Sequence, residues 1–278
     1  MPPMESPPYQ VLTRFERFAF RTMRFFNHGA IAPLSYLWQR YLIIPFVGIA
    51  VSRRLEVRGL ERLKALPKDA RILLVANHRT FFDLFVLGWI AWQRGGLKQR
   101  LNFPVRANFF YENPLGLAVC LTMSGGTMFP PFFRPVGKKP FNKHSLLVLI
   151  EKMKTPGQLV GFHPEGTRSK TDDPYTLLPA QPGAGELALK GRPTVVPAFI
   201  TGLTNSIWAE LKANARRERT VVAVFGDPVE LPPDEGETRL SHHKKFADVL
   251  TQRILALAEE EKTVRAASLL PPGPGSAG

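Results

Sequence analysis

Four short runs of the chain are apolar at almost every position. They are residues 72–76, 158–162, 194–200 and 220–225. A strand with one wet face would alternate apolar and polar residues, so uniform runs of this length predict strands that are covered on both faces. Longer helical or loop segments separate the runs. The pattern therefore predicts an α/β fold: a single domain with a mainly parallel central sheet flanked by helices.

Residues 11–26 have the pattern of an amphipathic helix. At about 100° per residue, one stripe is basic and contains Arg14, Arg17, Arg21 and Arg24. The adjoining arc carries Val11, Leu12, Phe15, Phe18, Thr22, Met23, Phe25 and Phe26, with Glu16 and Phe20 as exceptions. Such a helix suits the headgroup layer of a membrane, where rings enter the acyl boundary and guanidinium groups meet lipid phosphates. The alternative is an ordinary helix packed on the core with a solvated arginine edge.

The longest apolar run, residues 41–51, contains Pro45 and Gly48 and falls short of the roughly 20 residues that cross a bilayer. We therefore expect no spanning helix. The N-terminus also lacks the ordered regions of a secretory signal. Residues 11–54 are predicted to be a membrane-docking helical region, peripheral or monotopic, on the cytoplasmic face of a membrane. Disordered ends are expected where Pro and Gly accumulate, at residues 1–10 and 263–278.

The chain of 278 residues carries 37 lysines and arginines against 23 acidic residues, a formal charge of +14. This excess favours an anionic partner such as nucleic acid, an acidic membrane surface or a phosphorylated substrate. Residues 216–219 are basic enough for nucleic acid, but no recognised motif accompanies them, and we expect no such partner. The single cysteine, Cys120, excludes an internal disulfide and is expected to be a small buried hydrophobe.

Histidines near the C-terminus do not indicate a metal site. His242 and His243 are adjacent at the start of a segment whose apolar residues recur at helical intervals, and we expect both to be solvated. The only cysteine is distant from them, and no spacing of His and Cys fits a zinc site. We therefore expect neither a metal nor another bound cofactor.

The first candidate site follows the apolar run at residues 72–76. Asn77 and His78 form the expected turn, a helix is expected from about Thr80, and Asp83 falls in its first turn. Ligands of parallel sheets gather at the carboxyl ends of the strands. The Asp83 carboxylate could hold one ring nitrogen of His78 and leave the other free to deprotonate an alcohol near neutral pH. The alternative is a capping box in which Asp83 only satisfies the helix N-terminus.

A second polar turn follows the run at residues 158–162, and it reads His163-Pro164-Glu165-Gly166-Thr167-Arg168-Ser169. Arg168 can make a bidentate contact with a phosphate, and the two hydroxyl groups can add donors. Glu165 can orient the arginine or a substrate hydroxyl. Taken alone, however, a Glu-Gly-Thr-Arg sequence favours a plain surface turn with an Arg–Glu pair.

Together, the two segments resemble the glycerolipid acyltransferase family, which has an HxxxxD motif and includes 1-acyl-sn-glycerol-3-phosphate acyltransferase. The spacing of His78 and Asp83 matches the first block of the family, and residues 164–169 match the third. Residues 195–198 and 225–228 resemble the fourth block and the last strand and turn. The resemblance spans residues 55–229 and implies an acyltransferase domain over residues 55–262.

The resemblance implies that His78 and Asp83 are catalytic, and that arginines of the second and third blocks hold the phosphate of the acceptor. The substrate-binding residues carried over are Arg134, Glu165, Gly166, Thr167 and Arg168. Arg134 stands farther from the preceding glycines than is usual for the second block.

The chain departs from the family at two places. His163 replaces the commoner Phe, and Ala180-Gln181 stands where Phe-Lys is frequent. We expect His163 to be a structural substitution rather than a second base. The acceptor headgroup can therefore differ from that of plain lysophosphatidate.

The implied activity is O-acyl transfer from acyl-CoA or acyl-carrier protein to a lysophospholipid hydroxyl, with 1-acyl-sn-glycerol-3-phosphate giving phosphatidic acid. The chain has no Gly-x-Ser-x-Gly elbow, and Cys120 has no base near it in sequence, so we expect direct transfer with His78 as general base. Alternatives are the same chemistry on glycerol-3-phosphate, another lysophospholipid or an acylated amino lipid, and a non-catalytic membrane-binding module. The expected partners are the two substrates, an anionic membrane and, if it is the donor, acyl-carrier protein.

Overall fold

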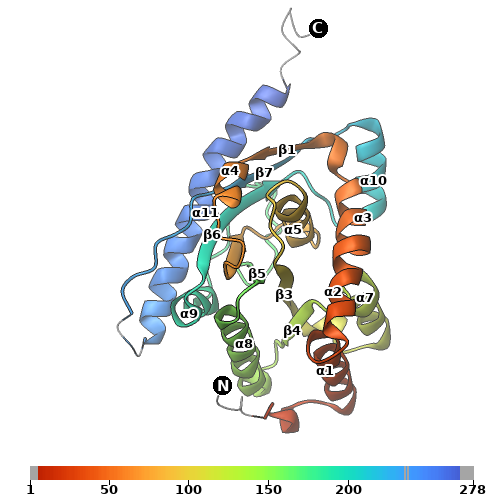
Figure 1. Ribbon diagram of the computed structural model, residues 1–278, viewed down its shortest axis with the longest axis vertical. Coiled ribbons are helices and arrows are strands. Elements are labelled where there is room, and N and C mark those ends of the chain that lie inside the picture. Colours follow the sequence, from red (N-terminus) through yellow and green to blue (C-terminus); the bar gives the residue numbers. More distant parts are fainter. Residues whose placement is uncertain (1–5, 235, 237, 270–278) are drawn as a thin grey trace, which may run out of the picture.

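A seven-stranded sheet forms the centre of the protein. The computed structural model describes residues 6–234, 236 and 238–269. Its strands lie in the order β1-β7-β6-β2-β5-β3-β4. Neighbours from β6 to β4 are parallel, whereas β7 runs antiparallel to β6 and pairs with β1 in parallel. The expected α/β fold with a mainly parallel sheet is confirmed, and helices pack on both sides of the sheet (Figure 1).

The strands are β1 (Leu55–Arg58), β2 (Ile72–Ala76), β3 (Arg100–Arg106), β4 (Met128–Phe132), β5 (Gln158–Phe162), β6 (Thr194–Thr201) and β7 (Val221–Phe225). The helices are α1 (Arg14–Asn27), α2 (Ala32–Trp38), α3 (Ile44–Ile49), α4 (Leu60–Lys64), α5 (Asp83–Gln93), α6 (Ala107–Phe110), α7 (Pro114–Ser124), α8 (Lys139–Lys154), α9 (Pro182–Gly191), α10 (Ile207–Arg216) and α11 (Leu240–Leu269). Four shorter helical turns are η1 (Tyr9–Val11), η2 (Gln39–Ile43), η3 (Ser52–Arg54) and η4 (Val136–Lys138).

Strand β2 is buried on both faces. Leu73 and Val75 belong to a cluster with buried residues of α8, α9 and α11, whereas Ile72 and Leu74 belong to a cluster with buried residues of α1, α3 and α5. Successive side chains of a strand point to opposite faces, so both faces of this strand need apolar residues. This double burial explains the uniform apolar run in the sequence.

The apolar runs correspond to four strands. Strands β2 and β5 have the expected bounds, β6 extends one residue further to Thr201, and β7 begins one residue later at Val221. The hydrophobic pattern does not predict β1, β3 or β4. Charged residues interrupt β1, Asn102 and Pro104 interrupt β3, and β4 contains Pro130 and Pro131. Because β4 lies at an edge of the sheet, its prolines can be accommodated without losing a hydrogen bond on both sides.

The face of α1 that packs on the core includes Glu16 and Phe20, which the helical pattern in the sequence did not place on a buried face. Thr13 caps the helix in a reciprocal capping box with Glu16. Glu16, Phe20 and Met23 are buried, and Glu16 forms an ion pair with Lys138. Glu16 and Phe20, treated as exceptions to the amphipathic pattern, are therefore part of the buried face, because a charged pair and an aromatic ring fill the contact with the core.

Apolar side chains remain exposed on the other side of α1 and on the helical column that follows it. This column comprises α2, η2 and α3 and runs along the right of Figure 1. The exposed residues are Phe18, Phe25, Leu34, Leu37, Trp38, Tyr41, Leu42, Phe46 and Ile49, and we call them the apolar N-terminal surface. Among the residues that the structure describes, no helix is both long enough and apolar enough to span a bilayer.

The C-terminal helix is longer than expected. Helix α11 continues to Leu269, so the prediction of disorder is wrong for residues 263–269, while residues 270–278 lie outside the described residues. Val264 is buried against β7, and Arg265 donates a hydrogen bond to the backbone oxygen of Thr220. These contacts hold the last turns on the sheet.

The N-terminal end, residues 1–10, was also predicted to be disordered, and part of it is ordered in the structure. Tyr9 belongs to η1, and its ring packs edge-on against Phe20, so residues 9 and 10 are ordered by contact with α1. Residues 1–5 lie outside the described residues. His243, expected to be solvated, is instead only 4% exposed and hydrogen-bonds Thr238. It lies on the face of α11 that packs against α9, whereas His242 is exposed.

Candidate active site

The carboxyl ends of four adjacent parallel strands bring the candidate residues to one edge of the sheet. His78 follows β2, residues 163–168 follow β5, Arg106 ends β3 and Arg134 follows β4. The order β2-β5-β3-β4 makes these strand ends neighbours, although they are far apart in sequence. The two polar turns identified in the sequence are thus adjacent in the structure.

His78 and Asp83 form a close pair. The Nδ1 atom of His78 lies 3.3 Å from Oδ2 of Asp83. The side chain of Asp83 is 1% exposed, whereas that of His78 is 22% exposed. A carboxylate oxygen can only accept a hydrogen bond, so this contact places the hydrogen of a neutral His78 ring on Nδ1. The Nε2 atom then keeps the lone pair that a general base requires.

Asp83 also caps the turn before α5. Its Oδ2 accepts hydrogen bonds from the backbone N–H groups of Arg79 and Thr80, both at 2.8 Å, and Oδ1 accepts one from the Thr80 hydroxyl at 2.5 Å. Helix α5 begins at Asp83 rather than near Thr80 as expected, because residues 79–82 form the turn that the carboxylate closes. Asp83 thus closes the turn and contacts His78, but α5 itself has Phe82 as its N-cap residue and no side-chain cap, so the capping box expected at the helix N-terminus is not formed.

The environment keeps Asp83 ionised. Burial alone would raise the pKa of its carboxyl, but the hydrogen bond from His78, the positive charges that His78 and His163 carry when protonated, and the Thr80 hydroxyl outweigh burial and leave the pKa below its usual 3.8. A charged Asp83 stabilises the imidazolium that forms when His78 takes a proton.

Glu165 supports the turn and does not face solvent. It is 2% exposed, and its two oxygens accept hydrogen bonds from the backbone N–H groups of His78 and Leu178, each at 2.7 Å. Burial raises the pKa of Glu165 against the lowering effect of these donors. The structure thus corrects the predicted role: Glu165 positions the backbone of His78, and its carboxylate is already occupied rather than open to substrate.

The backbone of His78 joins the two turns. Its N–H donates to Glu165, and its carbonyl oxygen accepts from the N–H of Ser169 at 2.9 Å. The preceding Asn77 is fully buried and exchanges two 2.8 Å hydrogen bonds with the backbone of Ile200 in β6. Neighbouring strands on both sides therefore fix the position of the base.

Guanidinium groups surround the turn after β5. Arg168 is exposed and donates to Asn205 at 2.7 Å. Arg106 donates from two nitrogens to the carbonyl oxygen of Gly166, at 3.1 and 2.9 Å. Gly166 has a φ of +63°, a conformation that favours glycine. Burial lowers the pKa of Arg106, and the nearby charges of Arg134 and Arg168 lower it further, so these three cations lie close together.

Two further arginines lie at this edge, and the sequence pattern assigned no role to either. Arg79 follows β2 and donates hydrogen bonds to Ser169 and Thr171. Arg106 ends β3, a position that would have identified it had β3 been recognised in the sequence. Thr167 is half-buried in the same turn, and Arg134 is exposed. The predicted substrate-binding residues thus share one edge, with Glu165 beneath it.

A cluster of His78, Asp83 and His163 has its ligand-type atoms within 4.8 Å of one another. The two imidazole rings, however, stack with planes only 4° apart and centroids 3.8 Å apart. Lone pairs of ring nitrogens lie in the ring plane, so two parallel rings do not direct them at a common ion. Asp83 is also occupied by backbone donors. The arrangement does not fit a metal site.

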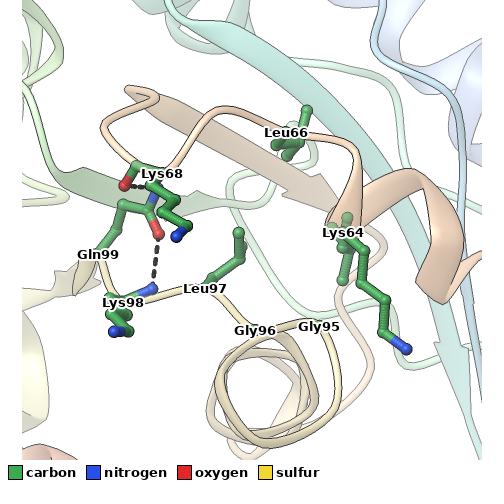
Figure 2. Close-up of a pocket in the computed structure, with 9 residues that line it drawn as sticks. Lys64, Leu66, Lys68, Gly95, Gly96, Leu97, Lys98 and Gln99 are labelled. Atoms are coloured by element: carbon green, nitrogen blue, oxygen red, sulfur yellow. Dashed lines mark hydrogen bonds between the residues drawn. The ribbon is translucent and has the colours of Figure 1, made fainter.

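A hollow of about 170 Å³ lies elsewhere in the protein, and Figure 2 shows the residues that line it. Its lining includes Leu66 and Lys68, which precede β2, and Lys98 and Gln99, which precede β3. These positions are at the amino ends of parallel strands, opposite the carboxyl edge that carries His78. The hollow is therefore not part of the candidate active site.

The chain belongs to the acyltransferase family. The model of this family, described as "Acyltransferase", matches residues 54–201, which is more than half of the 278 residues. The match includes the turns after β2 and β5 and both members of the His78–Asp83 pair. The family expected from the two sequence blocks is confirmed.

Two curated relatives are similar to the chain over part of their length. One is a glycerol-3-phosphate acyltransferase from Aeromonas hydrophila, 24% identical over 210 residues, with 69% of this chain and 23% of the relative covered. The other is a 1-acyl-sn-glycerol-3-phosphate acyltransferase from Saccharomyces cerevisiae, 27% identical over 152 residues, with 55% and 44% covered. The chain thus spans less than half the length of either relative.

Among solved structures, the chain is similar to the 1-acyl-sn-glycerophosphate (LPA) acyltransferase PlsC from Thermotoga maritima. The TM-score is 0.49 at 17% sequence identity, and the match covers 87% of this chain and 94% of that chain.

The lowered pKa of Asp83 predicts an acid-sensitive contribution to stability. The folded state binds fewer protons than the unfolded chain near the usual pKa of 3.8, so the contribution is present above about pH 5 and is lost as pH falls through the folded pKa. The Asp83→Asn variant should be less stable at neutral pH, and its free energy of unfolding should decrease less on acidification from about pH 5 to pH 3. Urea titrations of both proteins across this range measure the difference. An identical pH dependence in the two proteins would contradict the assignment.

Proposed function

We propose that this protein transfers a fatty acyl group from a thioester, acyl-CoA or acyl-carrier protein, to the hydroxyl of a lysophospholipid. The preferred acceptor is 1-acyl-sn-glycerol-3-phosphate, which would give phosphatidic acid. The observation that carries the proposal is the His78–Asp83 pair. Asp83 contacts Nδ1 of His78, so Nε2 of His78 keeps its lone pair, at an edge of the sheet that is rich in guanidinium groups. A base beside cations is what a phosphorylated alcohol requires of its catalyst.

In this mechanism His78 acts as general base. Its Nε2 takes the proton from the acceptor hydroxyl as the oxygen attacks the thioester carbonyl carbon. The new C–O bond forms, the C–S bond breaks, and the thiolate leaves with the electron pair of that bond. The proton on the imidazolium then neutralises the thiolate or passes to water. A thiol is far more acidic than an alcohol, so the leaving group needs no strong general acid.

Direct transfer is simpler than a covalent acyl-enzyme. Cys120 is fully buried, and burial raises the pKa of its thiol well above the usual range, so it is poorly suited to nucleophilic attack. The sequence contains no Gly-x-Ser-x-Gly elbow. The acceptor hydroxyl itself is the nucleophile in the proposed reaction.

The cations at the carboxyl edge are suited to the acceptor phosphate. Arg134 and Arg168 are exposed, and Arg106 lies close to both. Planar guanidinium groups bind phosphate oxygens in pairs, and several such cations at one edge of the sheet favour a dianion. We assign phosphate binding to these three arginines, with the Thr167 hydroxyl as an additional donor.

A second candidate is the same chemistry on glycerol-3-phosphate. The name of the Aeromonas relative favours this acceptor, which carries the same phosphate and also offers a hydroxyl. Ala180-Gln181 departs from the family pattern, and Gln181 lies against Gly166 in the turn after β5, so this is the position at which a different headgroup would be selected. Other lysophospholipids and acylated amino lipids remain alternatives of the same class. A non-catalytic membrane-binding module would bind lipid without consuming a thioester.

We further propose that the apolar N-terminal surface docks on an anionic membrane, as a peripheral or monotopic contact on its cytoplasmic face. Phe18 and Phe25 are 58% and 62% exposed, and the neighbouring Arg14, Arg21 and Arg24 are exposed as well. Aromatic side chains bordered by arginines favour the boundary between headgroups and acyl chains. Docking would bring the acyltransferase domain to its lipid substrate.

Replacing the base tests the mechanism. The His78→Ala variant should lose about 10²- to 10⁴-fold in kcat, because general-base catalysis contributes a factor of this size. The measurement is phosphatidic acid formed from acyl-CoA and 1-acyl-sn-glycerol-3-phosphate. His242→Ala, which removes an exposed histidine of α11, serves as the matched control and should retain the wild-type rate. A folded His78→Ala protein with near wild-type activity would rule out the assignment.

Replacing exposed leucines tests membrane docking. Leu37 and Leu42 are 47% and 52% exposed, and the double variant with Ser at both positions should bind anionic liposomes at least about tenfold more weakly, because buried apolar area is lost. Co-sedimentation with phosphatidylglycerol-containing vesicles measures the affinity. Leu240→Ser is the matched control, since Leu240 is 67% exposed at the start of α11. Equal binding by the double variant and the wild type would exclude docking through this surface.

A further inference from the structure

His163 and His78 lie face to face at the ends of neighbouring strands. Their ring centroids are 3.8 Å apart, and their planes differ by 4°. The register of the sheet pairs Val75 of β2 with Phe162 of β5, and the stack follows immediately beyond this pair. The contact between the two rings is therefore built on the register of two central strands.

The backbone fixes the ring of His163. Its Nδ1 lies 2.9 Å from the carbonyl oxygen of Ala76, and because a carbonyl only accepts, Nδ1 carries the hydrogen. Burial and the charge of His78 lower the pKa of His163 to about 3, although Asp83 and the carbonyl act in the opposite direction. Near neutral pH, His163 is a neutral, flat ring whose orientation the sheet determines.

The contact between the side chains of His78 and Asp83 does not by itself fix the orientation of the His78 ring plane. The distance from Nδ1 to Asp83 is 3.3 Å, longer than a typical N–H···O hydrogen bond, and the same oxygen accepts from two backbone N–H groups. The terminal torsion of a histidine is broad, so a single hydrogen bond at one ring atom allows the ring to rotate. A stacked neighbour restricts this rotation because the two rings would collide.

We propose that His163 is a positioning residue that holds the plane of the His78 ring by stacking, so that Nε2 is directed at the acceptor hydroxyl. This inference rests on the proposed acyl transfer with His78 as base. His163 exchanges no proton in the proposed reaction, since its Nδ1 keeps its hydrogen and donates it to the Ala76 carbonyl. Stacking contributes to the rate by orienting the His78 ring, because misplacement of a reacting group by about 1 Å can lower the rate about 10²-fold.

Two substitutions separate stacking from simple filling of space. His163→Leu removes the ring, and we expect kcat to fall by about tenfold to 10²-fold while KM for the acceptor changes by less than about twofold. His163→Phe retains a flat ring and should keep kcat within about threefold of the wild type. His242→Leu, on the exposed side of α11, is the matched control. If the leucine variant does not fold, His163→Ala removes the ring instead.

NMR of the His78 ring provides a readout that does not require turnover. The contact with Asp83 holds the ring hydrogen on Nδ1 in all three proteins, so we expect no change of tautomer. The ring current of a stacked aromatic neighbour shifts the carbon-bound protons of the His78 ring upfield, so these protons should resonate at similar positions in the wild type and in His163→Phe, and further downfield in His163→Leu. A wild-type protein that transfers no acyl group would refute the proposed function, yet these shifts would still test the stack. The positioning role is refuted if His163→Leu keeps the wild-type ring shifts or the wild-type kcat, or if His163→Phe loses as much activity as His163→Leu.

Discussion

The buried carboxylate of Asp83 is the interaction on which the site depends. An ionised group with 1% of its side chain exposed is costly unless hydrogen bonds replace its hydration. Asp83 obtains them from the backbone of Arg79 and Thr80, from the Thr80 hydroxyl and from His78. The turn after β2 must therefore adopt one conformation, and that conformation brings the imidazole to the carboxylate. Closure of the turn and the contact with the His78 ring are two consequences of a single buried charge.

The sheet holds this turn from both sides. Asn77 bonds the backbone of β6, while the backbone of His78 bonds Glu165 and Ser169 in the turn after β5. Catalytic groups supported by rigid strands and by further hydrogen bonds keep their geometry without reorganising during the reaction. The same parallel strand order places cationic residues from β3, β4 and β5 beside the base. The proposed chemistry thus depends on strand order as much as on the two sequence blocks.

Features encoded by local pattern could be predicted from the sequence, and features that depend on distant contacts could not. Uniform apolar runs located four of the five interior strands of the sheet, and the local spacing of His78 and Asp83 located the pair within a single turn. The importance of Arg106 depends on the place of β3 in the sheet, and Asn102 and Pro104 conceal this strand in the sequence. The stack of His163 on His78 depends on register between strands 87 residues apart. The buried face of α1 was misassigned because Glu16 is neutralised by Lys138, a partner that no helical wheel contains.

We propose that this site carries an acyl group from a thioester to a phosphorylated alcohol without a covalent enzyme intermediate. To test this, the protein is incubated with acyl-CoA or acyl-carrier protein, with and without 1-acyl-sn-glycerol-3-phosphate, and the masses of both lipid and protein are recorded. Direct transfer predicts phosphatidic acid only when both substrates are present, and a protein mass that never increases by one acyl group. Acylated protein formed in the absence of acceptor and consumed on its addition, or no lipid product with either donor, would contradict it.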